Sequence, residues 1–308
     1  MKEIKIPFLN LGASKNKVAL DIGTSSIKSV FISKQKTGAM QIDRFSIEQI
    51  EGERSRESVA AALKRFIAKQ ETKIQKAVIS VSGQSVVVRQ VLFPKMSSDE
   101  LHSALQFEAE KYIPFGINEV YIDAQMIDGK VEGGKVKVLI VAAKKDLVGE
   151  YITYMNDAGI APEAVDCDSI AVTNSFIFNN AGAGKDRTVA LLNIGASMTN
   201  VCILKDETLN FARDIPVEIK SIDALETQIR LSFDYYENQF GKGIDGIYIS
   251  GGGAKDTAVN ERLKQAFGLE MIVWDPTAKL VISPKVDSKA LKEISGQMAV
   301  CIGLAIRQ

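Results

Sequence analysis

Two short turns, roughly half a chain apart, combine glycine with residue types that bind phosphate. The segment 21–26 reads Asp-Ile-Gly-Thr-Ser-Ser, and the segment 193–197 reads Asn-Ile-Gly-Ala-Ser. Glycine lets the backbone approach an anion closely, and consecutive amide groups in a turn form an anion-binding concavity. The hydroxyls add hydrogen-bond donors, and a carboxylate such as Asp21 could position Mg²⁺ through water. This chemistry predicts phosphate binding, although either turn alone would also suit an ordinary β-hairpin.

The two turns belong to an internal repeat. Residues 18–28 and 190–200 each read as a strand, a tight turn and the start of a second strand. Asp21 and Asn193 are 172 positions apart, and the glycine two residues after each of them keeps the same offset. Two copies at half-chain separation predict two similar domains that face each other. The pairing favours phosphate binding over two unrelated hairpins.

A third glycine-rich turn follows a strand expected at 247–250. Gly251, Gly252 and Gly253 lead from this strand towards a helix expected at 258–267. A glycine-rich turn between a strand and a helix suits close contact with phosphate or with a flat ligand. The segment matches neither the Walker A motif nor the GxGxxG motif, so its ligand is not identified by either pattern.

The elements around these turns alternate between strands and helices. Strands are expected at 18–22, 27–33, 40–50 and 77–81, with an amphipathic helix at 57–69 before the last of them. Between 85 and 158 the pattern is strand, helix, hairpin and helix, which predicts a separate small unit. A final helix, 295–306, is rich in small residues and is therefore suited to close packing.

The composition fits a globular protein of about two domains and excludes several classes of function. The chain has 308 residues, with 38 basic and 38 acidic side chains, so no net charge attracts nucleic acid or anionic lipid. No apolar run reaches the roughly 18 residues of a membrane span. Cys167, Cys202 and Cys301 match no zinc or redox spacing, and His102 is the only histidine. We expect no nucleic-acid partner, no direct membrane insertion and no histidine-based catalysis.

The three turns, in this order, resemble motifs of the actin and hexokinase superfamily. The segments 21–26 and 193–197 resemble its two phosphate motifs, and 250–254 resembles its adenosine motif. Within that superfamily, the segment 107–115 reads Phe-Glu-Ala-Glu-Lys-Tyr-Ile-Pro-Phe. It is similar to a segment of the PilM family of type IV pilus assembly proteins, which are relatives of FtsA. The resemblance covers nearly the whole chain.

The resemblance implies an α/β fold of the actin-like, or ribonuclease H-like, type with two domains. The first domain would comprise 1–84, completed by 159–184 and 288–308. Residues 85–158 would form an inserted α+β subdomain of the FtsA and PilM type. Residues 185–287 would form the second domain, which is shortened after residue 216.

The resemblance also implies a cytoplasmic adaptor that binds ATP or ADP with Mg²⁺ and is peripheral at the inner membrane. Its partner would be a PilN-like inner-membrane protein, whose N-terminal cytoplasmic peptide would lie in a groove between the first domain and the inserted subdomain. Pilus assembly and motor components would be further partners. The residues implied for the nucleotide are Asp21, Gly23, Thr24, Ser25, Ser26, Lys28, Asn193, Gly195, Ala196, Ser197, Gly251, Gly252 and Gly253, with Asp21 also holding Mg²⁺ through water.

The groove residues implied for the partner peptide are Tyr112, Ile113, Pro114 and Phe115. They place aromatic and apolar surface at the end of a helix. A groove for an extended peptide combines such apolar pockets with strand-edge hydrogen bonds. The alternative is that the same four side chains pack the core of the small unit itself.

Two departures from the superfamily pattern argue against ATP hydrolysis. The second phosphate motif usually begins with Asp, but here it begins with Asn193, and an amide can neither act as a general base nor hold Mg²⁺ by charge. The chain between residue 216 and the strand at 247 is also short, so little is left to cover a ribose and base. Asp21 and Gln84 are the catalytic candidates, and Gln84 could orient a water. We expect nucleotide binding with doubtful turnover.

Two other functions stay open. A small-molecule kinase of the same superfamily would need a catalytic carboxylate facing a substrate cleft, and none stands beside residues 82–84. A filament-forming cell-division protein like FtsA would be expected to continue past residue 308 into a linker and a basic amphipathic helix. Both are therefore less favoured than the adaptor.

Overall fold

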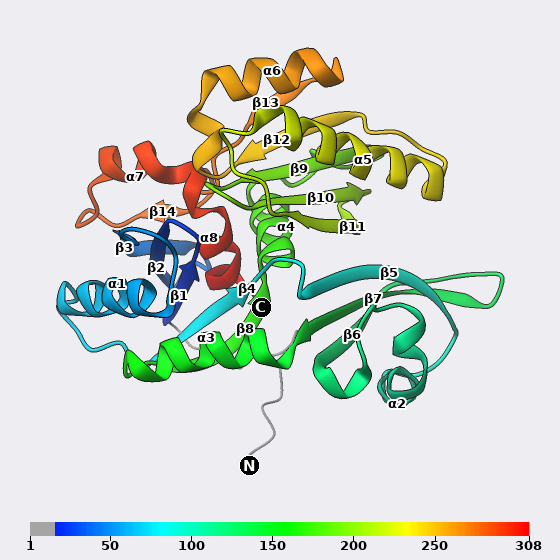
Figure 1. Ribbon diagram of the computed structural model, residues 1–308, viewed down its shortest axis with the longest axis horizontal. Helices are drawn as coiled ribbons and strands as arrows, with labels where there is room; N and C mark the ends of the chain where they lie inside the picture. The colour runs from blue at the N-terminus through cyan, green and yellow to red at the C-terminus, as the bar shows by residue number, and fades with distance from the viewer. Residues whose placement is uncertain (1–15, 308) are drawn as a thin grey trace.

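Two β-sheets with two helices between them form the body of the protein (Figure 1). The computed structural model describes residues 16–307; residue 308 and residues 1–15, which belong to the predicted first domain, lie outside that range. Each sheet carries one of the two turns predicted to bind phosphate. The expected mixed α/β architecture with two related halves is confirmed.

The first sheet contains, in spatial order, β14 (Val281–Ile282), β3 (Met40–Gln49), β2 (Ser26–Lys34), β1 (Asn16–Ile22), β4 (Lys76–Val81) and β8 (Ala161–Cys167). β1, β2 and β3 form an antiparallel meander, whereas β4 runs parallel to β1 and β8 runs parallel to β4. Successive strand residues point to opposite faces. Leu20 therefore packs with α1 (Arg56–Ala68) and α3 (Lys145–Asp157), while its neighbour Ala19 packs with the central helices.

The second sheet contains, in spatial order, β13 (Met271–Val273), β12 (Gly246–Ser250), β9 (Thr188–Ile194), β10 (Thr199–Lys205), β11 (Thr208–Ile215), β5 (Val86–Pro94), β7 (Lys135–Lys144) and β6 (Val120–Glu132). α5 (Ile222–Phe240) and α6 (Thr257–Phe267) cover its outer face. Buried residues of β9 and β10 alternate between this outer layer and the central helices: Leu192 faces outwards, and Leu191 faces inwards. The sheet therefore separates two apolar cores.

α4 (Asp168–Asn179) and α8 (Ala299–Ile306) fill the space between the two sheets (Figure 1). A side chain at Gly303 of α8 would overlap the carbonyl oxygen of Ala171 in α4, so only glycine permits this approach. The small residues of the predicted C-terminal helix are thus explained by core packing. Although α8 is apolar, no helix within residues 16–307 is both long and apolar enough to cross a membrane.

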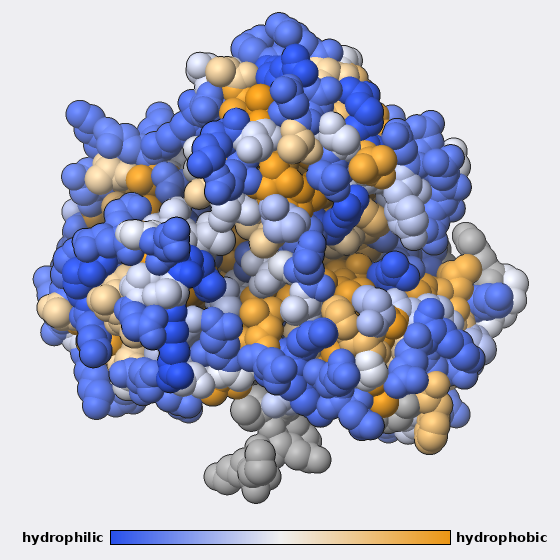
Figure 2. Space-filling view, in the orientation of Figure 1, coloured by the Kyte–Doolittle hydropathy of each residue, from blue (hydrophilic) through white to orange (hydrophobic). Residues whose placement is uncertain are grey.

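The inserted unit consists of β5, α2 (Ser98–Glu108), β6 and β7, and it has an apolar core of its own. Ser97 caps α2, as predicted, by accepting from the Glu100 N–H. β5 pairs with β11 where Arg89 faces Phe211, so the strands of the unit extend the second sheet. On the face shown in Figure 2, apolar surface gathers over the region where β5 and β7 lie in Figure 1.

The packing supports two adjustments to the proposed domain boundaries. Val148, Tyr151 and Met155 of α3 pack in the core beside α1, not in the core of the inserted unit. By its packing, α3 belongs with the first domain, which would place the end of the inserted unit after β7 instead of at residue 158. β14 pairs with β3, so the chain returns to the first sheet before α7 (Ser288–Ile294) begins, and the predicted domain bounds stay predictions.

A buried ion pair fixes the end of α8 to the first sheet. Arg307 Nη1 lies 3.1 Å from a carboxylate oxygen of Asp166 on β8, and both side chains are almost fully buried. Burial raises the pKa of the Asp166 carboxyl, although the Arg307 guanidinium partly opposes this shift. The carboxylate thus depends on its cation to stay ionised in this core.

Replacing Arg307 with alanine should lower the free energy of unfolding by about 3–5 kcal/mol, because it leaves the buried Asp166 without its cation. Urea denaturation measures this change. Arg56→Ala is the matched control, since it breaks an exposed pair with Asp157 that is worth at most about 1 kcal/mol. A loss for Arg307→Ala no larger than that of the control would show that the buried pair does not anchor the helix.

Candidate functional site

The first predicted phosphate turn links β1 to β2, and the surrounding fold holds it on both sides. Inside the turn, the Gly23 N–H donates to the Ser26 carbonyl oxygen at 3.0 Å. From outside, Arg54 donates to the Gly23 carbonyl oxygen at 3.4 Å, and the Tyr151 hydroxyl donates to the Ile22 carbonyl oxygen at 3.4 Å. The fold therefore fixes the shape of the turn, while its tip remains exposed.

The second predicted turn, between β9 and β10, is closed in the same way. The Gly195 N–H donates to the Met198 carbonyl oxygen at 2.9 Å, which is the equivalent bond in the repeat. A side chain at Gly195 would come within 2.7 Å of that oxygen, so the turn needs glycine. The internal repeat of the sequence is thus also a repeat of backbone geometry.

A polar side-chain pair lies directly behind each turn, and the two pairs differ in charge. In the first sheet, Lys28 Nζ donates to the Asp21 carboxylate at 2.9 Å. Burial alone would lower the pKa of Lys28, but the Asp21 carboxylate outweighs it and holds this pKa above its ordinary value. In the second sheet, the equivalent residues are Asn193 and Asn200, and the Asn193 amide donates to the Asn200 amide oxygen at 2.8 Å. Asn193 and Asn200 thus form a neutral pair at the position where the first sheet has the charged pair of Asp21 and Lys28.

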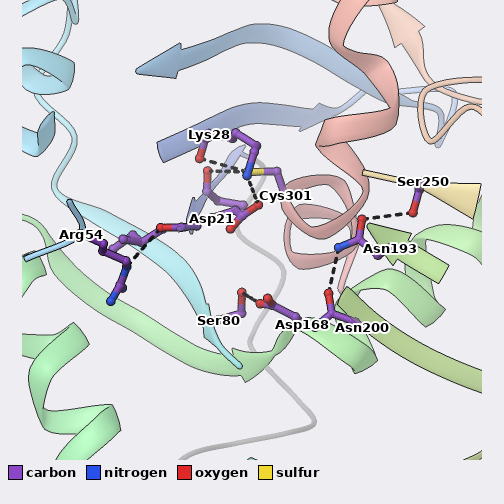
Figure 3. A network of polar contacts seen from close by, with 12 residues as sticks. Asp21, Lys28, Arg54, Ser80, Asp168, Asn193, Asn200, Ser250 and Cys301 are labelled. Carbon is purple, nitrogen blue, oxygen red and sulfur yellow. Dashed lines mark hydrogen bonds and ion pairs between the residues drawn. The ribbon is translucent and has the colours of Figure 1, made fainter. Parts of the chain in front are cut away.

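The neutral pair continues into a row of hydrogen bonds across four strands, of which Figure 3 shows the part from Ser250 to Asn200. The Ser250 hydroxyl of β12 donates to the Asn193 amide oxygen at 3.2 Å, and the Asn200 amide donates to Asp214 of β11 at 2.8 Å. The second carboxylate oxygen of Asp214 accepts from the Gly83 N–H at 2.6 Å. Burial raises the pKa of Asp214, although these donors oppose the shift. The row connects the second phosphate turn to the loop that follows β4.

Asp168, the first residue of α4, was not among the predicted site residues. Its carboxylate accepts from the Ser80 hydroxyl at 2.6 Å (Figure 3). Burial raises its pKa to about 7, and the charges of Asp21 and Asp214 contribute to the shift. A carboxyl that titrates near neutrality can accept or release a proton at physiological pH. The signal in the sequence was an acidic residue directly after the buried strand β8.

The third glycine-rich turn packs directly on the second phosphate turn. Gly251 has a φ of +88°, and a side chain there would overlap the backbone of Ile194. A side chain at Gly253 would overlap the side chains of Ile194 and Ile219. Gly252, by contrast, is exposed, and an added side chain would meet no atom closer than 3.9 Å. Two of the three glycines therefore serve packing, and the middle one leaves open space.

The central helix α8 joins the third turn to the first one. Just before α8, the carbonyl oxygen of Gly296 accepts from the Gly251 N–H at 2.7 Å. Within α8, the Cys301 thiol donates to the Lys28 carbonyl oxygen at 3.1 Å (Figure 3). Cys167, Cys202 and Cys301 are all buried and unpaired, as expected for small core side chains. The three turns are therefore held in one framework.

The tips of the three turns are exposed. Ser25, Ala196 and Gly252 are exposed, and the backbone behind each tip is fixed by the bonds described above. The short connection after β11 runs along the second turn, since the Ile219 N–H donates to the Ala196 carbonyl oxygen at 3.0 Å. Within residues 16–307, no group of three or more His, Cys, Asp or Glu side chains could hold a metal ion directly.

The predicted groove residues lie at the core of the inserted unit and at its surface. Ile113 is buried in that core, and the Tyr112 ring lies 5.7 Å from the Phe93 ring. Phe115 lies under Lys144, with the ammonium 4.7 Å from the ring centroid. Pro114 is exposed. The contact of these residues with a partner, and the role of the exposed Gln84, stay predictions.

A cavity of about 200 Å³ separates the inserted unit from α4. Its apolar walls include Leu139 and Val141 of β7 and Ile170 and Ile177 of α4. Polar side chains complete the lining; they are Asp123, Gln125, Thr173, Asn174, Glu207 and Thr208. The cavity lies between the inserted unit and α4 of the first domain, and Glu207, Thr208 and Leu209 of the second domain complete its walls. It therefore matches the expected groove between the first domain and the inserted unit only in part, and its walls do not include the segment 112–115.

Comparison with known proteins agrees with this geometry. The family model described as type IV pilus assembly protein PilM matches residues 19–217 and 221–308. A solved PilM-PilN type IV pilus biogenesis complex is similar with a TM-score of 0.82 and 23% sequence identity, covering 94% of this chain and 98% of that chain. The ethanolamine utilization protein EutJ from Carboxydothermus hydrogenoformans is similar with a TM-score of 0.52 and 11% identity, covering 97% and 92%. The expected actin-like fold is confirmed.

Asp168→Asn should change the stability of the protein in a pH-dependent way. The folded-state pKa of about 7 exceeds the ordinary value of 3.8, so the folded protein holds a proton that the unfolded chain releases. The free energy of unfolding of the wild type should therefore fall, relative to the variant, as the pH rises from about 4 to about 7. Urea denaturation at both ends of this range measures the difference.

The matched control is Asp157→Asn, since Asp157 is 54% exposed. Its difference from the wild type over the same range gives the effect of removing an exposed carboxylate from the surface. If the free energy of unfolding of Asp168→Asn differs from that of the wild type by the same amount at pH 4.5 and at pH 8, the fold does not hold the Asp168 carboxyl protonated.

Proposed function

This chain belongs to the PilM family of type IV pilus assembly proteins, and we propose that it acts as an actin-like adaptor in a type IV pilus or a related secretion or competence machine. The observation that carries this proposal is the cavity between the inserted unit and α4. The cavity has apolar walls, and it is lined in part by β6, which is the edge strand of the second sheet among the described residues. A groove beside an exposed strand edge suits an extended peptide.

The proposed occupant is the N-terminal cytoplasmic peptide of a PilN-like inner-membrane protein. Leu139, Ile170 and Ile177 would receive its apolar side chains, and the outer edge of β6 would receive its backbone hydrogen bonds. The similarity to a structure solved as a PilM-PilN complex supports this partner. We propose a cytoplasmic location, attachment to the inner membrane through this partner, and further contacts with pilus motor components.

ATP or ADP with Mg²⁺ is the proposed ligand of the three turns. The two phosphate turns would bind the phosphates, Asp21 would position Mg²⁺ through water, and the turn at 251–253 would border the adenosine. The actin-like fold and the open tips of the turns support this proposal. An amide cannot act as a general base, and both ends of the Asn193 amide are already engaged by Ser250 and Asn200. The nucleotide is therefore proposed as a bound effector, with doubtful turnover.

Filling the cavity between β6 and α4 should weaken peptide binding. The variant Gln125→Trp places a large side chain in the cavity, which Gln125 of β6 lines. Because Gln125 is exposed, the fold should survive the change. Calorimetric titration with a synthetic N-terminal peptide of a PilN-like protein should show at least about a tenfold loss of affinity. Leu92→Trp, at a 54% exposed position of β5, is the matched control and should bind as the wild type does.

Two outcomes would count against the partner proposal. A wild-type protein that does not bind the peptide would contradict the partner itself. Equal affinity of Gln125→Trp and the wild type would place the peptide somewhere other than the groove beside β6.

A carboxylate at the tip of the second turn should repel the phosphates. We expect Ala196→Asp to weaken Mg-ATP binding by roughly tenfold or more, because it places a negative charge against the ligand. Ala258→Asp, at a position on α6 that is also exposed, should leave the affinity unchanged. Equilibrium dialysis or calorimetry measures both. Failure of the wild type to bind Mg-ATP at millimolar concentration would refute the nucleotide proposal.

A further inference from the structure

We propose that the row Ser250–Asn193–Asn200–Asp214 couples the second phosphate turn to the loop that carries the inserted unit. One end of the row lies beside the glycine-rich turns, and the other end holds the Gly83 N–H. The inference rests on the proposed function, since it assigns a regulatory link between the nucleotide turns and the partner groove.

The row is a continuous line of cross-strand neighbours. Ser250 faces Asn193 in the β12–β9 register, Asn193 faces Asn200 in the β9–β10 register, and Asn200 faces Asp214 in the β10–β11 register. The three bonds between these side chains measure 3.2, 2.8 and 2.8 Å. Ser250 and Asn200 are almost fully buried, so water competes little for their hydrogen bonds.

The chemistry of the row gives every bond a direction. An ionised carboxylate only accepts hydrogen bonds, whereas an amide donates at one end and accepts at the other. Asp214 therefore requires the Asn200 NH₂ group, which leaves the Asn200 oxygen for Asn193, and the Asn193 oxygen for the Ser250 hydroxyl. A serine hydroxyl can also accept, but turning both amides over would set the Asn200 oxygen against the Asp214 carboxylate, so the carboxylate holds the observed order. A ligand that takes a hydrogen bond from Ser250 or Asn193 would therefore disturb the row from the end beside the glycine-rich turns.

The far end of the row holds the connection to the inserted unit. Gly83 has a φ of +105°, in the left-handed region that favours glycine, and lies in the loop between β4 and β5. Its N–H donates to Asp214 at 2.6 Å, and its carbonyl oxygen accepts from the Val86 N–H at 3.0 Å. In the same loop, the Ser85 carbonyl oxygen accepts from the N–H of Lys144, the last residue of β7, at 2.9 Å. The strands that enter and leave the unit thus meet at a loop that Asp214 anchors.

The contrast with the first repeat supports a distinct role for the row. Asp21 and Lys28 form a closed ion pair, in which the ammonium only donates and the carboxylate only accepts. The amides of Asn193 and Asn200 each do both, so the bond pattern can continue from strand to strand. The Asn that replaces the superfamily's usual Asp at position 193 is therefore a requirement of the row.

Amide hydrogen exchange of the full-length protein tests the inference, first without ligand. Asn200→Leu removes the middle of the row and should speed exchange of the Gly83 amide by roughly tenfold, since Asp214 loses the nearer of its two side-chain donors and keeps only the Ser169 hydroxyl at 3.5 Å. Asp214→Asn, which preserves volume, should act in the same direction and serves if Asn200→Leu folds poorly. Ser46→Ala is the matched control, because it breaks a half-buried cross-strand pair with Ser29 in the other sheet. Unchanged Gly83 exchange in both row variants would overturn the inference.

The second arm adds Mg-ATP as the probe. In the wild type, protection of the 195–197 amides should be accompanied by a change of about fivefold or more in Gly83 exchange. In Asn200→Leu, the 195–197 amides should still be protected, but Gly83 should no longer respond. Protection at 195–197 without a Gly83 response in the wild type would overturn the coupling alone. Absence of protection at 195–197 would overturn the coupling together with the nucleotide proposal, so the two failures are distinguishable.

Discussion

The close approach of α8 to α4 is the contact on which the rest of the structure depends. Gly303 lies so near Ala171 that no side chain fits between the helices, and both sheets pack against this pair. α4 begins at Asp168 beside the phosphate turns and then forms one wall of the groove. α8 follows the Gly296 carbonyl that holds the third turn. The candidate nucleotide site and the candidate partner groove therefore share one rigid support.

The two halves of the protein use the same backbone for different electrostatics. The first turn is backed by the Asp21–Lys28 ion pair, and the equivalent position in the second half holds two amides. Two amides can hydrogen-bond to each other, as an aspartate and a lysine can. An amide at only one of the two positions would leave the charge of the other without its partner. The result is one turn supported by charge and another joined to its neighbours by oriented hydrogen bonds. This difference makes the halves chemically unequal within a symmetric fold.

Much of the fold could be predicted from the sequence, because periodicity and the repeat report local structure directly. The turns, most strands and the capped helix α2 follow from such patterns. Asp168 and the groove could not be found this way. The pKa of Asp168 depends on burial beside Asp21, which is distant in the chain, and the groove walls come from β6, β7 and α4. The packing of α3 beside α1 could not be predicted from the sequence either, because an amphipathic pattern shows which face of a helix is buried but not which element covers that face.

A structure of this protein with the N-terminal peptide of a PilN-like protein and Mg-ATP tests the central claim most directly. The adaptor account predicts the peptide extended along the outer edge of β6, with its apolar side chains against Leu139 and Ile177. It also predicts phosphates at the tips near Ser25 and Ala196. A peptide bound on another face, with the cavity between β6 and α4 still open, would contradict the account.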